Sequence, residues 1–178
     1  MSKNKKIILT AILLALNIVL SRFISIKTPI MKISFAFVPT MLCATWLGVT
    51  WTVLLNVLGD LIGATLFPTG PFFIGYTITT AVAGFIYGIL LHKKKEDSFT
   101  EKQYIIRIII ATVLVAVISN LGLNTLWISI TAGKAFIPLL YTRFLKEIIS
   151  IPVHIIIFYA VERTLRKLFD TYIRSEND

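Results

Sequence analysis

The sequence of 178 residues contains few charged side chains, only 15% in all, and a single cysteine. A soluble domain of this length needs many more polar and charged residues to cover its surface. Cys43 has no second cysteine with which to form an intramolecular disulfide, and His92 and His154 are too far apart to suggest a metal site. The composition therefore excludes a soluble domain and gives no support to disulfide, redox or zinc chemistry.

Hydrophobic residues make up 56% of the chain, and the mean hydropathy is +0.83. Because a membrane-spanning helix needs about 20 apolar residues, six spans would take up most of the chain and leave only short connections. The apolar segments predict helices over residues 7–21, 33–47, 50–67, 72–91, 104–128 and 137–162. We expect an all-α integral membrane bundle of six transmembrane helices, forming a single domain over residues 1–178.

Basic residues cluster at three places that fall on one side of the membrane if there are six spans. They precede the first helix, lie between the fourth and fifth, and follow the sixth: Lys3, Lys5, Lys6, Lys93, Lys94, Lys95, Lys102, Arg163, Arg166, Lys167 and Arg174. Because cytoplasmic connections are enriched in lysine and arginine, both termini are predicted to be cytoplasmic. The net charge of +9 is divided among helix ends, which argues against a nucleic-acid partner.

Four further cations are predicted to lie at the outer ends of the helices, against this charge bias: Arg22, Lys134, Arg143 and Lys146. Their placement suggests an anionic ligand that is taken from outside. Glu147 is four residues after Arg143, so we expect these two side chains to pair and Lys146 to lie nearby. These three residues would then keep a net positive charge, which is available to bind a carboxylate of the ligand.

Three polar residues fall inside the predicted spans. Asp60 lies roughly half way along the third helix, where an ionisable group is a candidate for function or else a brace between helices. Asn120 and Asn124 are four residues apart on the fifth helix and so share a face. Such amides usually point into a bundle, as links between helices or as ligand donors.

Aromatic residues gather toward the same outer end, where Phe72, Tyr76 and Trp127 are the strongest candidates for ligand contacts. An ordinary interfacial belt explains them equally well. Flat rings beside Asp60, the asparagines and the outer cations would suit a planar heterocycle that carries carboxylates, with the rings stacking on it and the cations holding its acid tail.

No motif for catalysis, a cofactor or a metal is found. Gly133-Lys134-Ala135 lacks both the upstream glycine and the following hydroxyl residue of a phosphate-binding loop. Any step driven by ATP must therefore take place on another subunit. Ala11 and Ala15 form a pair of small residues on one face of the first helix, which allows close approach by another helix of the same chain or of a partner.

These features together resemble the substrate-binding S components of energy-coupling factor (ECF) vitamin transporters, over nearly the whole chain. The stretch Asn120-Leu121-Gly122-Leu123-Asn124-Thr125-Leu126-Trp127 is similar to the folate-type pattern. So are Gly133-Lys134-Ala135-Phe136 and the arginine and lysine at positions 143 and 146, which precede Pro152. Ala132 and Glu147 depart from that pattern.

The resemblance implies uptake rather than catalysis. A protein of this kind would bind folate, or another vitamin such as pantothenate, in the plasma membrane of a prokaryote, with its first external loop, residues 22–34, as part of a lid. It would then topple when a transmembrane T component and two ATPases act on it, with Ala11 and Ala15 docking on the T component. A membrane-embedded enzyme that uses Asp60 as a base is a weaker alternative.

Overall fold

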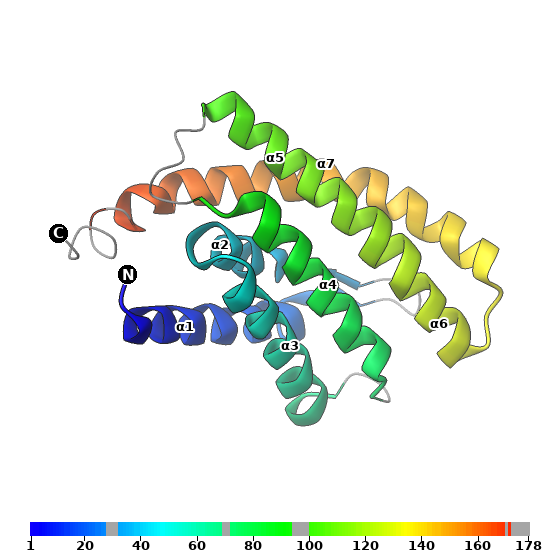
Figure 1. Ribbon diagram of the computed structural model, residues 1–178. Helices are drawn as coiled ribbons and strands as arrows, with labels where there is room; N and C mark the ends of the chain where they lie inside the picture. Colours follow the sequence, from blue (N-terminus) through cyan, green and yellow to red (C-terminus); the bar gives the residue numbers. More distant parts are fainter. Residues whose placement is uncertain (28–31, 69–71, 94–99, 170, 172–178) are drawn as a thin grey trace.

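The computed structural model describes residues 1–27, 32–68, 72–93, 100–169 and 171 of the chain (Figure 1). Its helices are α1 Lys3–Arg22, α2 Phe37–Leu47, α3 Val49–Leu66, α4 Ile74–Leu91, α5 Glu101–Leu114, η1 Val115–Leu123, α6 Asn124–Ala132 and α7 Phe136–Leu168. The segments α5, η1 and α6 form one continuous helix over Glu101–Ala132. The prediction of an all-helical bundle of six helices is therefore confirmed.

The bundle has two distinct ends. Helices α1 and α5 begin, and α4 and α7 end, at the end of the bundle that we call the inner end (Figure 1). The opposite end, where α1 stops and α7 begins, is the outer end. The charge pattern predicts that the inner end faces the cytoplasm. Lys94, Lys95 and Arg174, which contribute to that pattern, lie outside the described residues.

The first connection differs from the predicted loop. Strand β1, Ser25–Lys27, pairs antiparallel with β2, Lys32–Ser34, and Ser25 lies opposite Ser34. Residues 32–34 therefore belong to a hairpin and not to the second helix, which was expected to begin at residue 33. Residues 28–31, part of the expected lid, lie outside the described residues.

Helix α2 is consequently short. Its 11 residues cover about 16 Å, roughly half of the hydrocarbon thickness, whereas five other helices are long and apolar enough to cross a membrane. Nine of its residues are nevertheless buried, because the other helices surround it. Most of its surface therefore packs on protein, so this helix has no need of the length of a membrane span.

Glycines let the long helices approach closely. A Cβ atom on Gly88 of α4 would lie 2.5 Å from the Val49 Cα atom of α3, and one on Gly84 would lie 3.1 Å from the Val53 Cα atom. In lipid, close contact of this kind replaces the hydrophobic force that drives packing in water. The pair α3 and α4 therefore forms a tight central unit.

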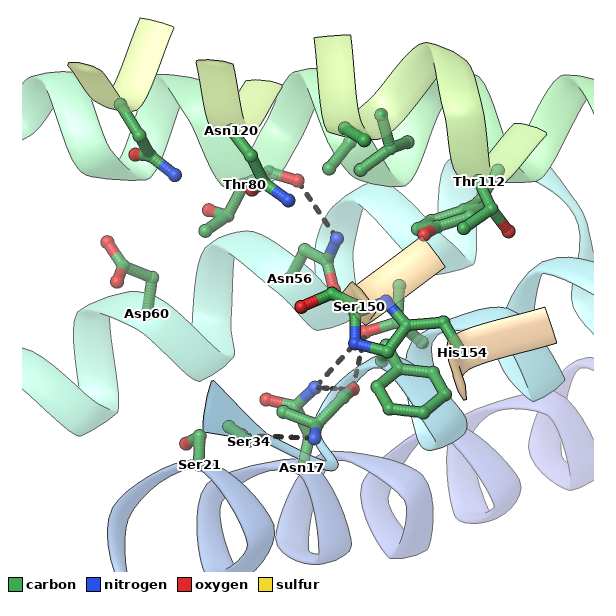
Figure 2. Close-up of a pocket in the computed structure, with 18 of the residues that line it drawn as sticks. Asn17, Ser21, Ser34, Asn56, Asp60, Thr80, Thr112, Asn120, Ser150 and His154 are labelled. Atoms are coloured by element: carbon green, nitrogen blue, oxygen red, sulfur yellow. Dashed lines mark hydrogen bonds between the residues drawn. The ribbon is translucent and has the colours of Figure 1, made fainter. Parts of the chain in front are cut away.

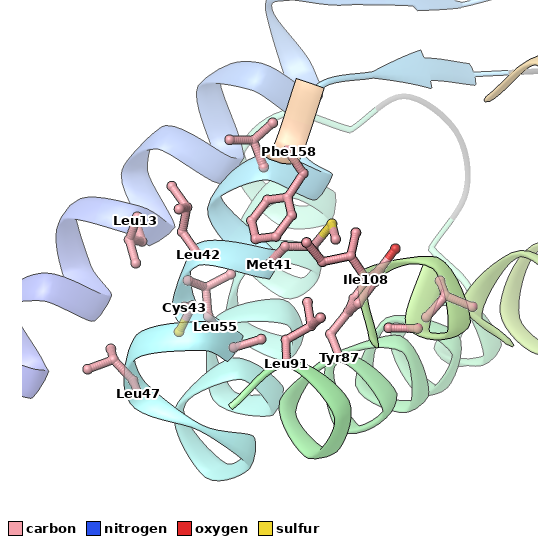
Figure 3. Packing of buried hydrophobic residues seen from close by; sticks show 14 of the residues in the cluster. Leu13, Met41, Leu42, Cys43, Leu47, Leu55, Tyr87, Leu91, Ile108 and Phe158 are labelled. Atoms are coloured by element: carbon pink, nitrogen blue, oxygen red, sulfur yellow. The ribbon is translucent and has the colours of Figure 1, made fainter. Parts of the chain in front are cut away.

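The inner half of the bundle is a closely packed apolar core (Figure 3). Met41, Leu55, Ile108 and Phe158, which come from four different helices, each have no exposed surface. Packing of this density resists even small changes of volume. The core closes the inner end, so any cavity must lie nearer the outer end.

Candidate ligand-binding cavity

A cavity of about 340 Å³ lies between the helices, outward of the apolar core. Figure 2 shows how side chains from α1, α3, η1 and α7 converge on it. Its polar lining residues are Asn17, Ser21, Arg22, Ser34, Thr40, Asn56, Asp60, Thr80, Thr112, Asn120, Asn124, Arg143, Lys146, Glu147, Ser150 and His154. A polar interior of this kind is expensive to maintain in a membrane unless it is used.

One wall is a chain of hydrogen bonds through four helices (Figure 2). The Asn17 Nδ2 atom donates to the Thr40 hydroxyl at 3.1 Å and to the Ala36 carbonyl oxygen at 3.0 Å. The Thr40 hydroxyl donates to the Asn56 Oδ1 atom at 2.8 Å, and the Asn56 Nδ2 atom donates to the Thr80 carbonyl oxygen at 2.9 Å. Because each donor in this network has an acceptor, the hydrogen bonds hold the four helices α1, α2, α3 and α4 together as a rigid wall.

The outer part of the cavity carries opposite charges. The Arg22 Nη1 atom donates to the Phe67 carbonyl oxygen at 3.4 Å, and the guanidinium of Arg22 packs against Gly63. The Asp60 Oδ2 atom accepts a hydrogen bond from the Thr77 hydroxyl at 2.7 Å. Asp60 is therefore oriented by α4, with its side chain still on the cavity wall.

Helix α7 contributes one continuous polar stripe. Arg143, Glu147, Ser150 and His154 all line the cavity, and their spacing of four, three and four residues places them on one helix face. Phe158 continues this face into the apolar core with no exposed surface. The predicted candidates Arg143 and Lys146 are thus brought into the cavity.

The expected pairing of Arg143 with Glu147 is not found among the described residues. Glu147 instead pairs with its neighbour Lys146, whose Nζ atom lies 3.0 Å from the Glu147 Oε1 atom. Arg143 is 9% exposed, and its buried Nη1 atom has no hydrogen-bond partner in the described chain. A buried guanidinium hydrogen that is left unsatisfied costs free energy, so this atom is available to a ligand acceptor.

The inner part of the cavity is aromatic. Phe37 of α2 and His154 of α7 stack with ring centroids 3.9 Å apart, and Tyr87 of α4 also lines the wall. The Thr112 hydroxyl is also buried in this wall. This end offers flat apolar surfaces and a few polar atoms, the combination that suits a planar ring.

The fifth helix is irregular where it lines the cavity. Residues Val115–Leu123 form the π-helical turns of η1, and the Asn124 backbone N–H donates to the Ser119 carbonyl oxygen. Widened turns of this kind often occur at functional sites. Asn120 and Asn124 both line the cavity, as predicted from their spacing.

Four predicted contact residues lie outside the cavity lining. Trp127 donates from Nε1 to the Thr79 hydroxyl at 3.0 Å, and its ring lies near that of Phe73. Tyr76 has its hydroxyl 3.3 Å from the Thr131 hydroxyl. Phe72 is 53% exposed, and Lys134 is exposed in the turn before α7.

Trp127 and Tyr76 are thus engaged between α4 and α6 and lie outside the cavity lining. The structure does not bring Phe72, Tyr76, Trp127 or Lys134 together with the other six candidates, because the outer ends of α4 and α6 bind each other. The side chains of Lys27 and Lys32 lie outside the described part.

Several lining residues were not expected from the sequence. Asn17, Thr40, Ser150 and His154 are polar residues within the predicted spans, and each lines the cavity. A polar side chain inside a predicted span is itself a signal of inward orientation. Their convergence, however, depends on how the helices pack.

Ala11 and Ala15 both lie on the exposed surface of α1. The opposite face of the same helix contains its buried residues Thr10, Leu13 and Asn17. The two alanines therefore do not serve packing within the described chain. They form a shallow strip, flanked by Ile12 and Leu16, on the outside of the bundle.

A bundle of apolar helices around a polar, charged cavity defines a class, the multi-pass membrane proteins that bind a small molecule between their helices. The chain belongs to one family within that class, the substrate-specific components of ECF transporters, whose pattern it matches over residues 5–162. The members of this family are components of transporters and not enzymes.

Individual relatives agree with this assignment. The chain is 33% identical to the folate transporter FolT of Clostridium novyi (strain NT) over 168 residues, which cover 94% of each protein. It is 32% identical to the folate transporter FolT of Leuconostoc mesenteroides subsp. mesenteroides over 177 residues, 93% of this chain and 92% of the relative. A crystal structure of FolT bound with folic acid superposes with a TM-score of 0.79 and 33% identity, covering 90% of this chain and 93% of that one.

Proposed function

We propose that this chain binds folate, or a closely related pterin with carboxylates, as the substrate-specific component of an ECF importer. The observation that carries the proposal is the cavity itself, which has arginines toward its outer part and stacked aromatic rings at its inner part. Folate has the matching chemistry, a flat heterocycle at one end and carboxylates at the other. The names of the similar proteins support the same substrate.

Within the cavity, the heterocycle would lie between the inner aromatic residues, and the acid tail would lie toward Arg22 and Arg143. The unpartnered Nη1 atom of Arg143 supports this role, since a carboxylate would supply the missing acceptor. Asp60, Asn120 and Asn124 remain candidates for polar contacts along the ligand.

A titration of the purified protein with folic acid tests the proposal. Arg143→Gln is expected to weaken folate binding about 10- to 100-fold, because a hydrogen bond between charged groups contributes about 1.5–3 kcal/mol. Arg163→Gln is the matched control, since Arg163 is exposed near the inner end of the same helix. Saturable binding of another vitamin such as pantothenate, with none of folate, would overturn the substrate assignment.

We also propose that the exposed strip of α1 docks on a T component that works with two ATPase subunits in a prokaryotic plasma membrane. Small side chains let a partner helix approach closely, and Ala11 and Ala15 are exposed as such a contact requires. Docking would let the partner subunits topple this chain and present the cavity to the cytoplasm.

Ala11→Leu and Ala15→Leu are expected to abolish co-purification with the T component and to leave folate affinity unchanged. Ala160→Leu is the matched control, because this alanine is equally exposed on α7. Loss of the complex in all three variants would show that any added bulk on the lipid-facing surface disturbs assembly, and would count against a docking strip on α1.

A further inference from the structure

The cavity contains two carboxylates that differ in burial and in their partners. Asp60 is half-buried, and its Oδ2 atom is engaged by the Thr77 hydroxyl. Glu147 is only 3% exposed, and its contact in the described chain is with Lys146 through Oε1. The Glu147 Oε2 atom makes no hydrogen bond within the described residues. A buried carboxylate in that state is costly unless something in the cavity donates to it.

Glu147 also has a defined place along the cavity. On the inward face of α7 it lies one turn inward of Arg143 and two turns outward of His154. Tyr87 and His154 line the inner aromatic part of the same cavity. Glu147 therefore lies between Arg143 at the outer part of the cavity and the aromatic rings at its inner part.

An acceptor at this place selects a particular chemistry. Two carboxylate oxygens accept hydrogen bonds and repel the carboxylates of an acid tail, so the tail cannot lie here. The end ring of a pterin carries an exocyclic amino group next to a ring N–H, and these adjacent donors match the two oxygens of one carboxylate. Each oxygen can accept more than one hydrogen bond, so the contact with Lys146 need not be broken.

We propose that Glu147 determines the specificity for the heterocycle of the ligand, because its carboxylate accepts hydrogen bonds from the 2-amino edge of that ring. This inference rests on the proposed folate-binding function and goes further, because it separates the roles of the two acids. Glu147 selects rings with adjacent N–H donors, while Asp60 stays tied to α4 through Thr77. A site built for such donors rejects an analogue that lacks them, since the acceptor would then be buried without a partner.

The test uses two ligands and three proteins. The ligands are folic acid and the analogue in which a methyl group replaces the 2-amino group, and their dissociation constants are measured by calorimetry in detergent. We expect the wild-type protein to bind folic acid about 10- to 100-fold more tightly than the analogue. We expect Glu147→Gln to reduce that ratio to about threefold or less, mainly by weakening folic acid, because one amide oxygen replaces the carboxylate and its NH₂ group faces the donors.

Asp60→Asn is the matched control, because it also replaces one lining carboxylate by an amide. Because Asp60 is itself a candidate ligand contact, any loss of affinity in this variant is expected to be equal for the two ligands, so that their ratio equals that of the wild type. If Asp60→Asn loses the preference for folic acid over the analogue while Glu147→Gln keeps it, the 2-amino edge is bound by Asp60 and the inference is overturned. An equal loss of affinity for both ligands in Glu147→Gln would also overturn it, since that is the effect of a structural ion pair.

The ligand comparison in the wild type does not depend on the folding of any variant. If the wild-type protein binds the analogue as tightly as folic acid, the inference fails while the proposed function stands. If it binds neither ligand, the proposed function itself fails. The two failures are therefore distinguishable.

Discussion

Helix α7 carries two buried acids in very different surroundings. At the inner end, Glu162 is 1% exposed and accepts hydrogen bonds from Arg166 at 2.9 and 2.6 Å, with the Lys93 Nζ atom at 3.5 Å. In the cavity, the partner of Glu147 within the described chain is Lys146, and the nearby Arg143 has a nitrogen without a hydrogen-bond partner among the same residues. The same residue types on the same helix face thus form a completed ion cluster in one place and an incomplete one in the other.

The difference separates structural from functional charges. Both acids are buried, but only Glu162 is surrounded by partners from the chain itself, including the Tyr104 ring, over which Lys93 lies at 3.1 Å. A completed cluster holds α7 to α4 and α5 at the inner end. The incomplete set lies beside the cavity, and the proposed function assigns its missing partner to a ligand. Burial alone does not separate the two acids, whereas the number of partners found in the described chain does.

The largest effect on stability is expected for Arg166→Met. This change removes two hydrogen bonds from a buried carboxylate and leaves Lys93 as its remaining cation. Because part of Arg166 reaches solvent, we expect a loss of about 2–3 kcal/mol in the free energy of unfolding, measured by SDS titration in mixed micelles. Arg163→Met, an exposed neighbour, should change it by less than about 0.5 kcal/mol. Equal losses in both variants would show that the ion cluster around Glu162 adds nothing to stability beyond an ordinary surface charge.

The next largest effect on stability is expected where α3 and α4 pack closely. In Gly88→Ala, the new methyl group meets the Val49 Cα atom at 2.5 Å, which is backbone that cannot move aside, so we expect a loss of about 2 kcal/mol. Gly133, in the turn before α7, has φ +61° and nothing within 4 Å of such a methyl group. Gly133→Ala should therefore cost only its backbone strain, about 1 kcal/mol. The reverse order would show that the tight unit of α3 and α4 tolerates extra volume.

A smaller effect is expected at the cavity wall. Thr40→Val keeps the shape of the side chain but removes the hydroxyl between Asn17 and Asn56, so we expect a loss of about 1–2 kcal/mol. Thr65→Val is the control, because the exposed Thr65 hydroxyl bonds only to carbonyl oxygens of its own helix. Thermal unfolding in detergent would compare the two variants, and equal midpoints would refute the rigid wall.

The smallest effect on stability is expected for Arg143→Met. The guanidinium lacks a partner at Nη1, so an apolar side chain of similar length should leave the free energy of unfolding unchanged or raise it by up to about 1 kcal/mol. Folate affinity should fall at least tenfold in the same sample. A clear loss of stability together with affinity would mean that Arg143 belongs with the structural charges.

Much of the fold could be predicted because lipid leaves few alternatives for an apolar segment. The third predicted helix, 50–67, is observed as Val49–Leu66, and the sixth, 137–162, as Phe136–Leu168. The second was predicted to begin at residue 33, but residues 33 and 34 pair with β1 and the helix begins at Phe37. Hydropathy carries no information about such pairing.

The site was predicted less completely than the fold. Arg22, Asp60 and Arg143 were expected from their charge and do line the cavity, whereas Trp127 and Tyr76 were expected from their rings and do not. Lys134 was also expected from its charge, but it is exposed in the turn before α7 and does not line the cavity. An ionisable group in a membrane has few stable positions, but an aromatic ring is stable in a core, at an interface or beside a ligand. The ring that stacks on Phe37 belongs to His154, which was not among the predicted ligand contacts.

The order of apolar and polar residues by itself determined that this chain is a bundle of six helices, because a bilayer core demands that backbone groups bond within each segment. The same order of residues also showed which charged side chains lie within the helices and therefore need a partner there. Only the tertiary structure decided which of those charges find a partner in the chain, since Glu162 meets Arg166 and Lys93 while Arg143 and Glu147 face a cavity. The physical reason is that satisfaction of a buried charge depends on atoms from several helices, which the local sequence does not place.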